Sequence, residues 1–227
     1  MPSKKSSTVS KTKLDTAETG TRAARKAAQP QRILAAALQA FGEKGFAATR
    51  MEDVAKHAGI TKGAIYLYFP SKQALLEALI RRDISPAISV AAARLKQHQG
   101  PIEPALRLVL ATAQKFLQGD VLPTYVRLIV AESGNFPDIA RFHLREIVSV
   151  VIGALSDLFE RAMARGDIRR MDPEIAARLF MAPIVKSVLW RVVFRAVEEK
   201  PFDPAPFLET HIGVFMRGMA PDAEPSK

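Results

Sequence analysis

Apolar residues recur every three or four positions along most of this 227-residue chain, which is the spacing that buries one face of an α-helix. Glycine and proline mark the boundaries between the segments. No segment carries a convincing strand pattern, so the sequence predicts an all-α protein. Two of the helices contain a proline, Pro86 or Pro183, where we expect a break or a kink. The pattern predicts helices over residues 73–97, 104–117, 123–132, 137–165, 172–197 and 204–217.

Before these helices, residues 49–72 (TRMEDVAKHAGITKGAIYLYFPSK) predict two short helices joined by a glycine turn. Thr49 and Glu52 have the spacing of a capping box, in which each side chain accepts a hydrogen bond from the other residue's amide. The apolar residues that follow have helical spacing. Gly59 comes directly after them, where a left-handed residue would end the helix without steric cost.

The second short helix is predicted to begin at Thr61, a good N-cap residue, and to end before Pro70. A short helix pair of this kind is typical of a DNA-reading helix-turn-helix. Its second helix would enter the major groove by its N-terminal end, where free amides favour phosphate. The alternative is an ordinary pair of packed helices with solvated lysines, and the spacing alone does not decide between them.

The longer segment ILAAALQAFGEKGFAATRMEDVAKHAGITKGAIYLYFPSKQALLEAL resembles the N-terminal domain of TetR-family transcriptional regulators. It covers about a fifth of the chain. The resemblance implies a three-helix DNA-binding domain whose helix-turn-helix residues lie against the DNA backbone. The elements that carry it are Phe41, Gly45-Phe46, Ala58-Gly59-Ile60, Tyr66, Tyr68-Phe69 and Ser71-Lys72. The DNA contacts that it implies are Thr49, Arg50, Thr61, Lys62, Gly63, Ala64, Tyr66, Leu67, Tyr68 and Lys72.

Two positions of the second short helix depart from the commonest family pattern. Ala64 replaces a frequent hydroxyl residue, and Leu67 replaces a frequent histidine or other polar residue. Base recognition is therefore expected to use apolar contacts, such as those to thymine methyl groups. The operator sequence does not follow from these residues.

The segment LPTYVRLIVAESGNFPDIARFHLREIV is similar to part of the regulatory domain in a subset of TetR-like proteins. The resemblance implies a ligand pocket and a homodimer without identifying a ligand. The central helices supply many aromatic and aliphatic side chains but few ionisable groups that are clearly inward, which favours a small and largely apolar effector. Tyr125, His143 and Trp190 are the polar-tipped candidates to orient it. Each aromatic residue has an alternative role as ordinary core packing. The candidate pocket residues are Phe116, Tyr125, Ile129, Phe142, His143, Phe159, Trp190 and Phe194.

The helices predicted over residues 172–197 and 204–217 carry apolar side chains on more than one face, so they should be buried on several sides. We expect them to pair with their copies as a four-helix dimer interface. Two recognition helices would then lie about 34–36 Å apart, or further apart on widened DNA, over a palindrome. The candidate interface residues are Ile184, Val188, Val192, Leu208, Ile212 and Phe215.

The net charge of +10 is concentrated toward the N-terminus. Residues 1–30 hold seven basic and two acidic side chains, residues 31–72 hold six and three, and the remainder holds twenty and eighteen. A basic segment next to a helix-turn-helix raises DNA affinity through counterion release. The alternative for the basic terminus is a solvated, flexible segment without a specific role.

Composition and motifs argue against several other classes of protein. The chain has no cysteine, which excludes disulfides, thiolate metal sites and thiol catalysis. Its four histidines occur singly, without the spacing of a helical metal site, and no phosphate-binding loop is present. No apolar run is long enough to cross a membrane and no signal-type apolar core follows the N-terminus. We therefore expect a cytoplasmic protein that is not an enzyme and needs neither metal nor cofactor.

The predicted organisation has four parts: a basic flexible arm over residues 1–28, a DNA-binding domain over 29–75, a regulatory and dimerisation domain over 76–220, and a flexible tail over 221–227. Two functions fit it. One is a homodimeric, ligand-responsive regulator, most often a repressor in this family, which binds palindromic operator DNA. The other is an effector-independent architectural DNA-binding protein, which would have a solid C-terminal core and little sequence preference.

Overall fold

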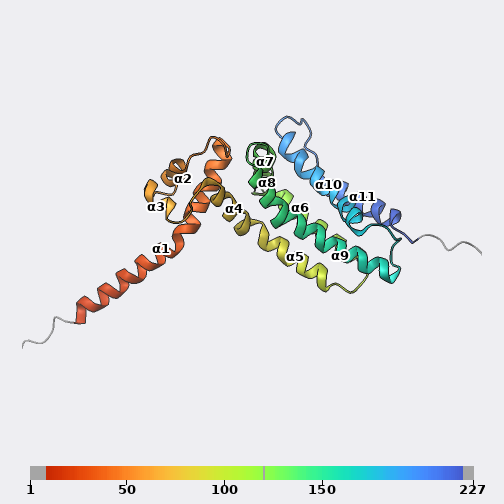
Figure 1. The fold of residues 1–227 in the computed structure, drawn as a ribbon, viewed down its shortest axis with the longest axis horizontal. Coiled ribbons are helices and arrows are strands. Elements are labelled where there is room, and N and C mark those ends of the chain that lie inside the picture. The colour runs from red at the N-terminus through yellow and green to blue at the C-terminus, as the bar shows by residue number, and fades with distance from the viewer. Residues whose placement is uncertain (1–8, 120, 222–227) are drawn as a thin grey trace, which may run out of the picture. The chain divides into compact units, whose positions relative to one another are not determined.

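The computed structural model describes residues 9–119 and 121–221, and every regular element in these ranges is a helix (Figure 1). The chain divides into two compact units, Met1–Leu76 and Glu77–Lys227, with the boundary inside one helix. The helices are α1 (Val9–Lys44), α2 (Met51–His57), α3 (Lys62–Tyr66), α4 (Lys72–Asp83), α5 (Ser85–Gln97), α6 (Ile102–Gln118), α7 (Val121–Glu132), α8 (Pro137–His143), the π-helix η1 (Leu144–Val148), α9 (Ser149–Arg165), α10 (Pro173–Val193) and α11 (Pro204–Gly218).

The N-terminal unit closes around apolar side chains from α1, α2, α3 and the start of α4. Ile33, Val54, Ile65 and Leu75 have no exposed surface. The chain leaves α1 through Gly45, whose φ of +79° is a left-handed conformation that favours glycine. The small core positions the turn between α2 and α3.

The first helix differs from the predicted flexible arm. Residues 9–28 form the N-terminal part of α1, which continues through Pro30 to Lys44. This stretch is rich in alanine, lysine and arginine, which are strong helix formers, so the helix extends beyond the apolar residues that pack in the N-terminal unit. Residues 1–8 of the predicted arm and 222–227 of the predicted tail lie outside the described residues.

The C-terminal unit is a helical bundle in which α10 packs on α7, α9 and α11. Its core contains an aromatic cluster, because the Phe159 ring lies 6.4 Å from Phe180 and 5.8 Å from Phe215. Leu155, Leu158 and other aliphatic side chains fill the space around these rings. No described helix has the length and apolarity needed to cross a bilayer.

Most predicted helix boundaries lie close to the observed ones, and the differences are local. The predicted break near Pro86 separates α4 from α5 at Ile84. Residues 137–165 are helical throughout, but the π-helix η1 interrupts them. The helix predicted over 172–197 ends at Val193, and the second short helix ends at Tyr66 rather than at Phe69. Hydrogen-bonded turns follow both helices: the Phe69 amide donates to the Ile65 carbonyl, and the Glu198 amide donates to the Phe194 carbonyl.

Candidate nucleic-acid interface and ligand pocket

The turn between α2 and α3 has the geometry that the sequence predicts. Gly59 has a φ of +66°, and the amide of Ile60 donates to the Ala55 carbonyl at 3.0 Å. Thr61 then caps α3, because its hydroxyl accepts a hydrogen bond from the Ala64 amide at 3.2 Å. The two short helices are thus held in a fixed arrangement with α3 on the outside of the unit.

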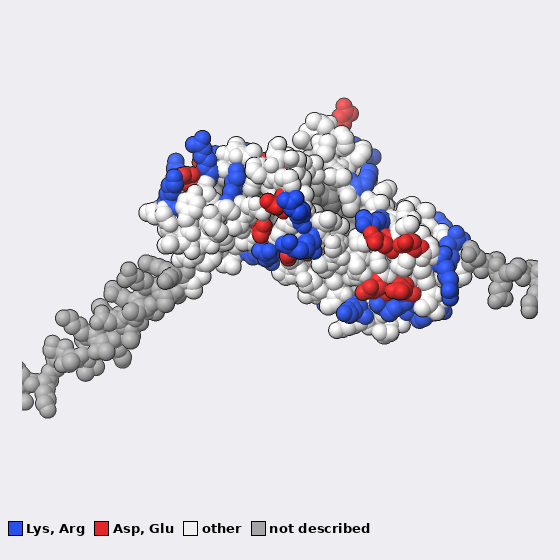
Figure 2. Space-filling model, in the orientation of Figure 1, with Lys and Arg blue, Asp and Glu red and all other residues white. Residues whose placement is uncertain are grey.

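One face of α3 is anchored and the other is open to solvent. Ile65 is fully buried, whereas Tyr66 is 44% and Leu67 is 84% exposed. Thr61, Lys62 and Gly63 are also exposed, as is Arg50 before α2, while Ala64 and Tyr68 are partly covered. Lys and Arg side chains gather over α2 and α3, with acidic side chains among them (Figure 2). The surface could therefore contact a polyanion by charge and base edges by Tyr66 and Leu67.

Ion pairs between neighbouring elements hold this surface in place. Lys62 of α3 contacts Glu52 of α2 at 2.5 Å, and this hydrogen-bonded pair lowers the pKa of Glu52. Lys44 at the end of α1 contacts Asp53 at 2.8 Å and lowers the pKa of that carboxyl. All four side chains reach solvent, so the pairs contribute little to stability and mainly fix orientation.

The cap at the start of α2 lies one residue later than predicted. Arg50 is the N-cap residue, and its amide donates to Asp53 Oδ2 at 2.9 Å in place of the predicted pair of Thr49 and Glu52. Thr49 is 1% exposed, and its hydroxyl donates to the carbonyls of Gly45 and Ala40 at 2.6 and 3.1 Å. The predicted DNA contact by the Thr49 side chain is therefore wrong for this structure, because the hydroxyl is used inside the unit.

Lys72 also has internal partners that the sequence does not reveal. Its ammonium donates to the carbonyls of Phe46 and Ala47 at 2.5 and 2.9 Å, and it lies 4.5 Å from the centre of the Phe46 ring. These contacts fasten the start of α4 to the loop between α1 and α2. Lys72 therefore has a structural role within this unit, and its predicted contact with the DNA backbone stays a prediction.

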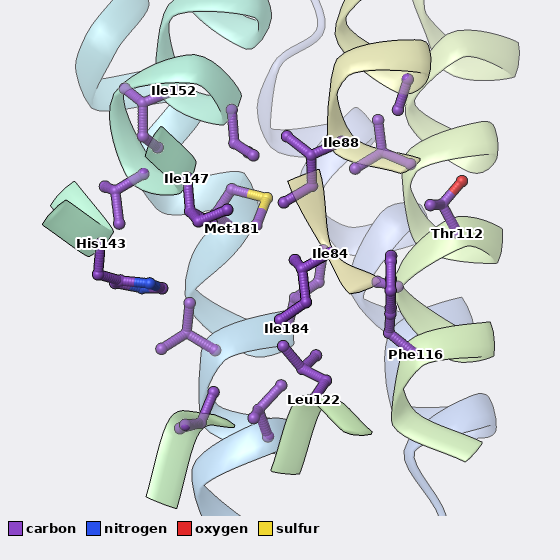
Figure 3. Close-up of a pocket in the computed structure, with 18 of the residues that line it drawn as sticks. Ile84, Ile88, Thr112, Phe116, Leu122, His143, Ile147, Ile152, Met181 and Ile184 are labelled. Atoms are coloured by element: carbon purple, nitrogen blue, oxygen red, sulfur yellow. The ribbon is translucent and has the colours of Figure 1, made fainter. Parts of the chain in front are cut away.

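The C-terminal unit contains a cavity of about 460 Å³ between α5, α6, α7, α9 and α10 (Figure 3). Its walls are almost entirely aliphatic, with Ile88, Ile152 and Ile184 among the residues that face it. Ile80 at the C-terminal half of α4 and Ile84 at the break between α4 and α5 also line it. The polar side chains in the wall are those of Thr112, Tyr125 and His143. A volume of this size fits a small organic molecule.

The structure brings four of the eight predicted pocket residues to this cavity: Phe116, Tyr125, Ile129 and His143. The other four lie elsewhere. The buried Phe142 packs beneath the guanidinium groups of Arg81 and Arg145, at 4.8 and 5.8 Å from its ring centre. Phe159 belongs to the aromatic core cluster.

The predicted pocket roles of Trp190 and Phe194 are also corrected, because these two residues lie at the end of α10. The Trp190 indole N–H donates to Glu198, and the ring packs on Phe202 and on the ammonium of Lys186. Phe194 follows the end of α10 and is 42% exposed. Both side chains stabilise the turn after α10, so Trp190 does not orient a ligand in the cavity. Sequence reasoning favoured aromatic residues, whereas isoleucine and valine form most of the wall.

Tyr125 links the cavity wall to α4. The residue is fully buried, and its hydroxyl donates to Asp83 Oδ2 at 2.9 Å. Arg82 donates to the same carboxylate at 2.5 and 2.8 Å. Burial, helped by the charge of Asp83, raises the pKa of Tyr125 far above its usual value, so the phenol keeps its proton.

His143 is the last residue of α8 and is followed directly by η1, a type of helix that is frequent at functional sites. Its imidazole points toward the cavity (Figure 3). Burial lowers the pKa of His143, because the charged form is poorly solvated there. The ring is therefore neutral at physiological pH.

The predicted dimer-interface residues face inward. Ile184 and Val188 line the cavity, and Leu208 and Ile212 are fully buried in the core. Val192 and Phe215 are partly buried against that core. The four buried side chains are therefore not available for contact with a second copy, whereas Val192 and Phe215 keep part of their surface exposed. The exposed apolar residues of α10 and α11 are Ile175, Leu179, Val185, Leu189, Val193 and Val214.

Within the described residues, no group of three or more His, Asp or Glu side chains could hold a metal ion. The site consists instead of an exposed helix-turn-helix in one unit and a mostly aliphatic cavity in the other. Together they define a helix-turn-helix DNA-binding protein with a separate helical domain.

The comparisons with known proteins agree with this class. Residues 33–79 match the model of bacterial regulatory proteins of the tetR family, and residues 104–217 match the C-terminal domain of AefR-like transcriptional repressors. The chain belongs to the TetR family of transcriptional regulators. It is therefore an all-α, DNA-binding regulator of transcription.

Similar proteins cover both units. The transcriptional regulator RutR of Escherichia coli is 27% identical over 206 residues, which are 88% of this chain and 85% of RutR. The crystal structure of native NalD, the secondary repressor of the MexAB-OprM efflux pump in Pseudomonas aeruginosa, has a TM-score of 0.70 at 24% identity and covers 86% of this chain and 98% of NalD. FadR of Bacillus subtilis in complex with stearoyl-CoA has a TM-score of 0.68 at 19% identity, covering 83% and 98%.

Proposed function

We propose that this protein is a homodimeric repressor that binds palindromic operator DNA through α3 and is released by a small, largely apolar effector. One observation carries the proposal: the same chain holds an exposed helix-turn-helix and an apolar cavity of about 460 Å³ that α4 itself lines. The cavity favours this function over that of an architectural protein, which would have a solid core. Its place of action is the cytoplasm, where a bacterial operator is accessible.

The DNA contacts proposed here come from the exposed side of the helix-turn-helix. Arg50 and Lys62 supply positive charge for phosphates, and Thr61 and Tyr66 supply hydroxyls. Leu67 is 84% exposed and has no polar atom in its side chain. It is therefore suited to contact a thymine methyl group rather than to form a hydrogen bond with a base.

The dimer contact proposed here uses the outward side of α10 together with α11. Ile175, Leu179 and Val193 lie toward one side of α10, with about four turns between Leu179 and Val193, and are 51%, 53% and 56% exposed, and Val214 of α11 is 56% exposed. Exposed apolar side chains in one stripe are a typical feature of a protein interface. A two-fold interface buries the same stripe on both copies and presents two copies of α3 to a palindrome.

Release of DNA requires an effector that binds one conformation better than the other. Helix α4 runs from Lys72, which is fastened to the helix-turn-helix unit, to Asp83, which Tyr125 of the cavity wall binds. Ile80 on the same helix faces the cavity. A ligand can therefore move α4 directly, with a coupling free energy on the order of 1–3 kcal/mol.

The proposal is tested by selecting DNA from a random pool with the purified full-length protein and sequencing it. We expect an inverted repeat. Leu67→Ala should change the preferred bases, whereas Arg50→Ala should weaken binding to all sequences and lower the salt slope by about one unit. Lys96→Ala on α5 removes the same charge from an exposed position outside the helix-turn-helix and should do neither. Selection without any sequence preference would support the architectural alternative instead.

A further inference from the structure

The cavity has no charged side chain in its wall. Its lining comes from aliphatic residues, Met181, Phe116 and the three polar residues Thr112, Tyr125 and His143. A carboxylate or an ammonium group inside it would lose its water shell without gaining an ionic partner, which is strongly unfavourable. The chemistry of the wall therefore selects uncharged ligands.

Two of the three polar side chains already have partners. The Tyr125 hydroxyl donates to Asp83, as described above. The Thr112 hydroxyl donates to the Leu108 carbonyl of its own helix at 2.8 Å. Neither hydroxyl therefore has a free donor proton for a ligand oxygen.

His143 is different. Its Nδ1 is buried and has no hydrogen-bond partner among the described residues, and the residue lines the cavity. A neutral imidazole carries one donor and one acceptor, and a buried polar group without a partner is costly. In Figure 3 the ring enters the cavity from one side, while Thr112 and Phe116 lie on the opposite side. Of the three polar residues in the cavity wall, His143 is thus the one that has a buried atom without a hydrogen-bond partner among the described residues.

We propose that the effector is an uncharged, mainly aliphatic molecule with one hydroxyl or carbonyl oxygen, and that His143 binds this oxygen and determines specificity. The apolar body of the molecule extends from His143 toward Phe116 and Leu122, between Ile84, Met181 and Ile184. The inference rests on the proposed function only where it calls the ligand an effector. The ligand chemistry itself follows from the wall.

The ligand class is tested by isothermal titration calorimetry of the full-length protein at pH 7.5. The three probes share one chain length: 1-decanol below its solubility limit, and decanoate and decylammonium below their micellar concentrations. An alcohol both donates and accepts, so it can pair with either tautomer of His143. We expect saturable binding of 1-decanol, with a Kd at least about tenfold lower than that of either ion.

The role of His143 is tested with two variants of the same residue. His143→Phe should weaken 1-decanol binding on the order of fivefold, which is the effect of one hydrogen bond. His143→Gln keeps a donor and an acceptor and should retain most of the affinity. His98→Phe is the matched control, because it makes the same change outside the cavity wall, and its Kd should stay within about twofold of wild type. Thermal unfolding of each variant checks that it is folded.

The inference is overturned by any of three results: no saturable binding of 1-decanol, decanoate binding as tightly as the alcohol, or an unchanged Kd in folded His143→Phe. Different outcomes would contradict the proposed function. If 1-decanol binds through His143 but leaves the affinity for selected DNA unchanged, the ligand chemistry stands and the effector role is lost. If another ligand releases DNA independently of His143, the repressor stands and the specificity role is lost.

Discussion

The Thr49 side chain supports the helix-turn-helix from inside the N-terminal unit. Its hydroxyl donates to carbonyls near the end of α1 while the residue is almost completely buried. Lys72 binds the neighbouring carbonyls of Phe46 and Ala47. The two residues therefore hold the connection between α1 and α2, which fixes where the helix-turn-helix begins.

Thr49→Val should destabilise the N-terminal unit by about 1–3 kcal/mol, because the buried carbonyls of Ala40 and Gly45 lose their donor without gaining water. Urea unfolding followed by circular dichroism measures the change. Thr49→Ser keeps the hydroxyl and should lose less stability than the valine variant. A valine variant as stable as wild type would show that these hydrogen bonds are not required.

His143 makes a pH-dependent contribution to stability. Burial lowers the pKa of His143 in the folded chain below its value of about 6.5 in the unfolded chain. The unfolded state therefore binds more protons below about pH 6.5, and stability should fall as the pH decreases through that range. The pKa of His211 is also lowered by burial and adds to the effect. His143→Phe should reduce, but not abolish, the loss of urea midpoint between pH 7.5 and 5.5. An equal loss in the variant would contradict the assignment.

Contacts between residues close in the sequence were predictable, whereas contacts between residues far apart in the sequence were not. The Thr61 cap and the Gly59 turn depend on residues within three or four positions, and both occur as predicted. The partner of Thr49 at Ala40 is nine residues away, and that of Lys72 at Phe46 is 26 residues away. Such contacts depend on how helices pack, which spacing along the chain does not show.

Among the elements, α9 illustrates how glycine position determines stability. Gly166 ends the helix with a φ of +78°, and its amide donates back to Ala162 and Met163. Gly153 lies within the same helix on its exposed side, with open space where a Cβ would be placed. The two glycines therefore have opposite expected responses to alanine.

Gly166→Ala should destabilise the protein by about 1 kcal/mol, because alanine is strained in the left-handed conformation. Gly153→Ala should stabilise it by about 0.5–1 kcal/mol through its higher helix propensity. Each variant is the control for the other in the same urea titration. Equal effects of the same sign would contradict this account of the end of α9.

Helix α10 carries apolar residues on both of its sides, and the sequence could not assign which side faces the core. Ile184 and Val188 were predicted for the dimer contact and face the cavity instead, whereas Ile175 and Leu179 are exposed. A helix that is apolar all around has no preferred face in its pattern, so only packing distinguishes the two.

The double variant Ile175→Glu and Leu179→Glu should convert the proposed dimer to a folded monomer, because it places four like charges across a two-fold interface. Light scattering at micromolar concentration measures the mass. Val90→Glu, on an exposed position of α5, is the matched control and should leave the dimer intact. A double variant with the mass of wild type would place the interface elsewhere.

For the whole molecule, α4 is the covalent connection between DNA recognition and the cavity. Its first residue is fastened within the helix-turn-helix unit, and its C-terminal half contributes Ile80 to the cavity wall. The all-α class was predictable from periodicity and from the family resemblance. The cavity walls were not, because a cavity results from the space that aliphatic residues on several helices leave unfilled.

The most direct test of the central claim is the affinity of the full-length protein for its selected inverted repeat, measured by fluorescence anisotropy with and without saturating 1-decanol at constant salt. A coupling on the order of 1–3 kcal/mol predicts a rise in the Kd of the operator of roughly fivefold to 150-fold, and His143→Phe should require more alcohol for the same rise. An operator Kd that stays constant while calorimetry shows the cavity filled would contradict the account of a ligand-released repressor.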